Sequence, residues 1–121
     1  MISKHKIFLL ITLNISILSV FAATKTASVS GNWSNTATWG GAAAPVSGGG
    51  DNIVVNAGIT LTMDAAYSTT GTLTMNATCI LDVHTYNATF GSITGAGTIN
   101  NVAGGGTPLL TCGSDNTSTT F

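Results

Sequence analysis

Asp82 and His84 are the residues in this chain whose types and spacing best suit acid–base chemistry. Residues two apart on a β-strand point to the same face, so a carboxylate and an imidazole here can exchange a proton or hold a metal ion. No third ligand lies nearby in the sequence, and such a pair more often forms only a surface hydrogen bond. We therefore predict no catalytic residue, no metal site and no cofactor.

The acidic residues offer a second route to catalysis, because glycoside hydrolysis uses paired carboxylates. The chain has four acidic residues, which are Asp51, Asp64, Asp82 and Asp115. Stacked strands can align such residues, but the sequence has no arginine to steady an acidic sugar or a developing negative charge. We expect no enzymatic activity, and a fragment of a polysaccharide-degrading enzyme stays open as an alternative.

Three aromatic residues are the candidates for ligand binding: Trp33, Trp39 and Tyr86. Exposed rings of this kind stack on the apolar faces of sugars, while neighbouring Thr and Asn side chains can bind the sugar hydroxyl groups. The alternative is that both tryptophans bury their rings and cover one end of the core.

Cys79 and Cys112 are the only cysteines, and a bond between them would close a long loop. In an oxidising compartment such a disulfide would stabilise the fold by about 4 kcal/mol on a chain-entropy argument. The other interpretation is two unpaired small hydrophobic residues, since the sequence does not reveal whether their Cα atoms come close enough.

The N-terminus has the three parts of a secretory signal peptide. Lys4 and Lys6 precede an apolar run over residues 7–21, and small residues at the end of the run predict cleavage after Ala22. Four polar residues interrupt the run, which is also shorter than the roughly 20 apolar residues of a membrane span. We predict a secreted or cell-surface protein with no membrane segment after cleavage.

Removal of residues 1–22 leaves one lysine, Lys25, against the four aspartates, so the mature chain has a net charge of −3. Binding of nucleic acid depends on clustered Lys and Arg side chains. The composition therefore argues against a nucleic-acid partner.

The amino-acid usage favours strands over helices. Glu, Gln and Arg, which are ordinary helix formers, are absent, while Thr, Val, Ile, Gly and Asn are abundant. Alternating polar and apolar residues predict strands at 52–56, 59–63, 71–75 and 79–84, with weaker candidates at 88–93 and 97–102. We predict an all-β protein.

A short repeat suggests how the strands are arranged. The tetrapeptide at residues 60–63, Thr-Leu-Thr-Met, recurs at residues 72–75, with threonine on one face and Leu or Met on the other. Stacked coils explain such a recurrence, so we predict a short right-handed parallel β-helix (β-solenoid) of about three coils, with a small β-sandwich as the alternative. A ladder of these threonines also raises the alternative of an ice-binding protein.

The remaining segments divide the chain as follows. Residues 23–50 are predicted to form an N-terminal cap and Gly-rich loop, residues 51–105 the β-solenoid module, and residues 106–121 a flexible tail. An uncapped last coil would favour end-to-end association of the chain with its own copies through open strand edges.

Several motifs resemble those of known extracellular proteins. They are Asn32-Trp33-Ser34, Thr38-Trp39-Gly40-Gly41, Pro45, Gly50-Asp51-Asn52-Ile53-Val54-Val55, Gly58 and Leu61-Thr62-Met63-Asp64. Together they resemble the opening of the eight-glycine extracellular domain family. Residues 71–74 and 95–99 are similar to repeats of large secreted bacterial β-helix proteins and adhesins. The resemblance implies secretion and a β-rich fold, and we expect a structural or adhesive module that binds through its surface, with extracellular glycans as candidate ligands.

Overall fold

The computed structural model describes residues 22–102 and 104–113. The predicted signal peptide lies outside the described residues except for Ala22, as does the end of the chain from residue 114. Within the described ranges the protein is all-β, with its strands gathered in three sheets and no α-helix. No helix in these ranges is long and apolar enough to cross a membrane.

All strand pairs in the described part of the chain are parallel, so the antiparallel pairing of a small β-sandwich is not observed. The first sheet has the order β1 (Thr24–Ala27), β3 (Asn52–Val55), β6 (Thr72–Met75), β9 (Ser92–Gly95). The second has the order β10 (Thr98–Asn100), β7 (Ile80–Asp82), β4 (Thr60–Thr62), β2 (Gly31–Asn32). The third has the order β11 (Leu110–Cys112), β8 (Ala88–Phe90), β5 (Tyr67–Ser68).

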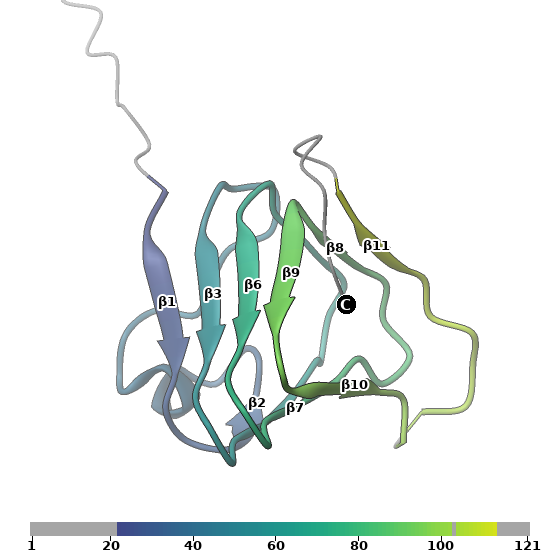
Figure 1. The fold of residues 1–121 in the computed structure, drawn as a ribbon, viewed down its shortest axis with the longest axis horizontal. Coiled ribbons are helices and arrows are strands. Elements are labelled where there is room, and N and C mark those ends of the chain that lie inside the picture. Colours follow the sequence, from purple (N-terminus) through teal and green to yellow (C-terminus); the bar gives the residue numbers. More distant parts are fainter. Residues whose placement is uncertain (1–21, 103, 114–121) are drawn as a thin grey trace, which may run out of the picture.

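The chain passes through the sheets in turn, and we call each pass a circuit (Figure 1). The first circuit has strands in the first and second sheets, and each later circuit has one strand in each of the three sheets. The first circuit covers residues 24–50, the second 52–68, the third 72–90 and the fourth 92–112. Because each circuit adds its strands beside those of the circuit before, β9, β10 and β11 lie together at one end of the molecule.

The register brings apolar residues of successive circuits into line. Ile53, Leu73 and Ile93 are partners in the first sheet, evenly spaced along the chain, and all three are buried. The second sheet aligns Leu61 with Leu81 at the same spacing. Continuous apolar rows of this kind give the three sheets a common core.

The register corrects the interpretation of the recurring tetrapeptide. Residues 60–62 form β4 in the second sheet, whereas residues 72–75 form β6 in the first. The two threonine pairs are therefore not stacked on one another. The structural repeat is instead the longer interval that separates Ile53 from Leu73 and Leu73 from Ile93.

Glycine marks the corner at which the chain leaves the third sheet for the first. The N–H of Gly91 donates to the Gly71 carbonyl at 2.9 Å, and that of Gly113 to the Gly91 carbonyl at 2.8 Å. A Cβ atom at Gly91 would collide with the carbonyl oxygen of Thr70. Only glycine allows successive circuits to approach this closely, and Gly91 divides the strand predicted at residues 88–93 into β8 and β9.

Two of the predicted segments contain short strands. Residues 23–50 contain β1 and β2 as well as a 3₁₀ turn, η1 (Thr36–Trp39), that contacts both strands. Residues 110–112, predicted to belong to a flexible tail, form β11 and pair with β8. Strands as short as β1, β2 and β11 are stabilised by pairing with neighbouring strands rather than by their own sequence. The alternation of polar and apolar residues therefore did not reveal them.

Candidate ligand-binding clefts around Asp64

Asp64 follows β4 and joins two circuits through its carboxylate. It accepts a hydrogen bond from the backbone N–H of Ser34 at 3.1 Å and another from the Ser34 hydroxyl. The pairing of β2 with β4 continues to this point, because the N–H of Trp33 donates to the Thr62 carbonyl at 2.8 Å. Asp64 is half-buried, and it lines two surface clefts.

The larger cleft has a volume of about 340 Å³ and lies between residues 44–47 and residues 64–67. Trp33, Tyr67, Pro45 and Val46 give it a mainly apolar lining, to which Asp64 adds a carboxylate. The Trp33 and Tyr67 rings pack with their centroids 4.4 Å apart. The cleft therefore combines a mainly apolar lining with an acidic hydrogen-bond acceptor, while the Trp33 and Tyr67 rings are almost fully buried.

The two tryptophans are buried, with exposed fractions of 5% for Trp33 and 4% for Trp39. Trp33 reaches the larger cleft, whereas Trp39 lines neither cleft and packs against Trp33 with a centroid distance of 5.3 Å. Full stacking of a sugar on either ring would require the ring to be uncovered. Both rings instead belong to the buried apolar core.

The smaller cleft has a volume of about 170 Å³ and also includes Asp64 in its lining. Asn32, Thr62, Met63, His84 and Tyr86 complete its lining. The His84 and Tyr86 rings are 5.9 Å apart between centroids, and Tyr86 is half-buried. Tyr86 is thus a predicted ligand-binding residue that is partly open to a cleft.

Asp82 and His84 come together, but through the backbone of the histidine. The buried Asp82 carboxylate accepts the His84 backbone N–H at 2.9 Å, and His84 has a positive φ of 53°. The histidine ring instead lies 3.3 Å from the Thr85 hydroxyl through its Nδ1 atom. Asp82 therefore holds a turn, and within residues 22–102 and 104–113 no three His, Cys, Asp or Glu side chains gather as a metal site.

Cys79 and Cys112 are both free thiols in the structure. Cys79 lies directly before β7 and is fully buried, and this burial raises the pKa of its thiol. Cys112 ends β11 in the third sheet and packs against the edge of the core.

Sequence reasoning missed the central place of Asp64 and its contact with Ser34. Both residues end a polar–apolar–polar triplet, at 32–34 and 62–64, and this shared pattern was the available signal. Comparison with known proteins finds no match to a protein-family model, a curated protein or a solved structure.

Proposed function

We propose that this protein is a secreted structural or adhesive module that binds a neutral glycan at the two clefts beside Asp64. We also propose that its three parallel sheets form a right-handed β-solenoid, capped at its N-terminal end by residues 33–41. The even spacing of the paired residues supports the solenoid, and right-handed connections between parallel strands are the strong general rule. The signal-peptide motif and the resemblance to eight-glycine extracellular domains support secretion.

The arrangement around Asp64 carries the proposal. Sugars present apolar C–H faces and hydroxyl groups, so their sites combine aromatic surface with a few polar groups. Trp33 lines one cleft and Tyr86 the other, Asp64 lines both, and Asn32 and Thr62 line the cleft that contains Tyr86. Each cleft thus has an aromatic residue in its lining, and the two clefts share the Asp64 carboxylate as a hydrogen-bond acceptor. This arrangement suits the binding of adjacent units of an oligosaccharide.

The charge of the chain narrows the class of glycan. Asp64 lines both clefts, and the net charge after the predicted cleavage is −3. Acidic sugars would be repelled, so neutral hexose polymers are the favoured ligands. The lining of the two clefts contains one carboxylate, whereas the alternative of a polysaccharide-degrading fragment would need a second one there.

A glycan array probed with residues 23–121 tests this proposal. We expect binding to neutral oligosaccharides that weakens on the order of tenfold in Asp64→Asn and in Tyr86→Ala, because each loses one or two contacts. Asp51→Asn is the matched control, since Asp51 bonds the Ala23 N–H at 3.1 Å and lines neither cleft. Absence of binding by the folded wild type, or equal loss in the control, would contradict it.

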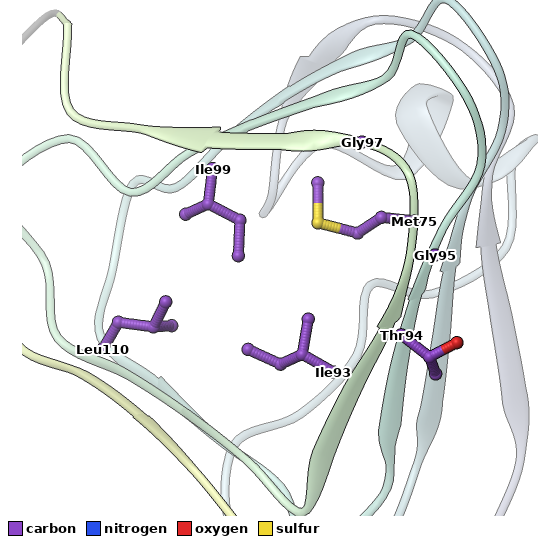
Figure 2. A pocket seen from close by; sticks show the side chains of 7 residues that line it. All are labelled: Met75, Ile93, Thr94, Gly95, Gly97, Ile99 and Leu110. Carbon is purple, nitrogen blue, oxygen red and sulfur yellow. The ribbon is translucent and has the colours of Figure 1, made fainter. Parts of the chain in front are cut away.

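One observation favours the ice-binding alternative as a second candidate. The register of the first sheet aligns short uncharged side chains in two columns on its outer face. They are Thr24, Asn52, Thr72 and Ser92 in one column and Thr26, Val54, Thr74 and Thr94 in the other. The Thr72 and Ser92 hydroxyls lie 2.8 Å apart, and the Thr94 side chain points away from the interior (Figure 2).

Inhibition of ice recrystallisation separates this candidate from glycan binding. If the outer face binds ice, Thr74→Lys abolishes the inhibition because a bulky hydrated charge interrupts the array, while Asp64→Asn leaves it unchanged. Wild-type protein without any effect on recrystallisation would remove the candidate.

A further inference from the structure

The fourth circuit leaves one end of the core open. A hollow of about 290 Å³ lies inside β9, β10 and the start of β11. The side chains of Met75, Ile93, Ile99 and Leu110 point into it, as Figure 2 shows. Leu110 is 37% exposed, and Val102 and Leu109, in the loop before it, are also exposed. The end of the molecule at the fourth circuit therefore presents apolar side chains.

The backbone at this end is also unpartnered. In the part of the chain that the structure describes, no strand pairs with the outer edges of β9, β10 and β11. Such edges are ordinarily protected by charged side chains, above all lysine. These three strands contain no charged residue at all. Nothing on them would repel a second copy.

The opposite end of the stack is covered. The N–H of Ser28, directly after β1, donates to the Thr38 carbonyl of η1 at 2.9 Å. The Lys25 ammonium group donates to the Ala43 carbonyl at 3.2 Å. The first circuit is therefore a poor partner for the open end, which argues against head-to-tail stacking and leaves contact between two open ends.

The sequence beyond Gly113 is poorly suited to the hollow. Gly113 repeats the corner contact of Gly91, after which Ser92 begins a first-sheet strand with Ile93 pointing inward. Beside the apolar side chains that line the hollow, a carboxylate such as that of Asp115 would be costly. Residues 114–121 contain one apolar side chain, Phe121.

We propose that the open end is a self-association surface through which two copies form a two-fold symmetric dimer. A two-fold axis that lies in the contact plane and is perpendicular to β9 reverses the direction of β9 and the sense in which the circuit runs. The edge of β9 then pairs antiparallel with β9 of the partner, while β10 and β11 exchange places. The two hollows face each other, so Ile93, Ile99 and Leu110 of both copies leave water together. This dimer is independent of the clefts beside Asp64.

The proposed dimer sets a requirement on the contact area at the open end. A stable dimer commonly takes about 800 Å² from each partner, roughly a tenth of the surface of a small protein. At the open end this area would have to come from three strand edges and from the exposed side chains of Val102, Leu109 and Leu110.

Sedimentation velocity over a range of concentrations tests the proposal on residues 23–121. We expect a monomer–dimer equilibrium without larger species. Leu110→Lys places two like charges in the contact and weakens the dimer on the order of 100-fold. Val29→Lys is the matched control, because it makes the same kind of change at an exposed apolar residue near the covered end. We expect it to leave the dissociation constant of the dimer unchanged. Circular dichroism establishes that each variant is folded.

Two further variants keep the test decisive. Thr98→Lys adds a charge at the exposed first residue of β10 while keeping every apolar side chain, and we expect it to weaken the dimer as well. Phe121→Ser leaves the dimer unchanged if the second copy is the occupant. The proposal would be overturned if the wild type is monomeric at all concentrations or forms open-ended oligomers. It would also be overturned if Phe121→Ser associates more tightly than the wild type, because the chain's own C-terminal end would then be the occupant of the hollow.

Discussion

The indole N–H of Trp39 donates to the carbonyl oxygen of Trp33 at 2.7 Å, and the two rings meet edge to face. This contact fixes the polypeptide between η1 and β2, because Trp33 directly follows β2 and Trp39 ends η1. Trp33 in turn packs on Tyr67 of β5, so one aromatic group connects the first and second circuits. The wall of the larger cleft depends on this packing.

Replacement of Trp39 should therefore destabilise the fold through the cap. Trp39→Phe keeps most of the apolar surface but removes the hydrogen bond, and we expect a loss of about 1–3 kcal/mol. Trp39→Ala also leaves a cavity and should cost about 3–5 kcal/mol, much of the stability of a small domain. Urea unfolding followed by the fluorescence of Trp33 measures both. Midpoints equal to that of the wild type would show that the cap contributes little.

Gly91 provides a test of the corner between circuits. Gly91→Ala should destabilise the protein by about 2 kcal/mol or more, because the added Cβ meets the Thr70 carbonyl and backbone must move. Gly105→Ala is the matched control, since a Cβ there has no atom within 4 Å, and should change stability by less than about 0.5 kcal/mol. Thermal unfolding of both variants compares them. Equal effects would mean that the circuits are not stacked as closely as described.

The strands and their class were accessible from the sequence because alternation reports which face of a strand is buried. The predicted strands at 52–56, 71–75 and 79–84 became β3, β6 and β7 with slightly shorter bounds. In contrast, β2 and β5 are too short to show a pattern. Their positions are set by hydrogen bonds to neighbouring strands, and these depend on the register.

The site was less accessible because circuits differ in length. Leu61 pairs with Leu81, but the interval from Gly31 to its partner Leu61 is longer, since the first circuit also contains η1 and the Gly-rich loop. A search for one fixed period cannot bring Ser34 beside Asp64. Trp33, in contrast, was identified from its type and its neighbours, although its burial depends on packing that composition does not reveal.

Burial of Tyr67 predicts a loss of stability in alkali. Its exposed fraction is 4%, and desolvation raises its pKa from 10.0 to about 12, with the neighbouring Thr69 hydroxyl acting in the opposite direction. The folded state favours the neutral phenol of Tyr67. The resulting contribution to the free energy of unfolding is therefore fully present below pH 10. It is lost as pH rises from 10 towards 12, because the unfolded chain releases the proton first.

Tyr67→Phe should therefore lose less stability across this pH window than the wild type does. Urea midpoints measured below pH 10 and within the window test the expectation, and Tyr86→Phe serves as the matched control at the half-buried tyrosine. If both variants follow the wild-type pH dependence, Tyr67 is not the group responsible.

The two thiols should differ in their reactivity. Cys79 is fully buried, and its desolvation raises its pKa, so the thiolate that attacks an aromatic disulfide reagent is scarce and covered. In Cys112→Ser we expect no fast-reacting thiol in the native protein and one thiol per chain after unfolding. In Cys79→Ser the half-buried Cys112 should react without unfolding. If wild-type protein isolated from an oxidising compartment yields no thiol even after unfolding, the two cysteines are paired, and the free thiols of the structure do not describe the secreted form.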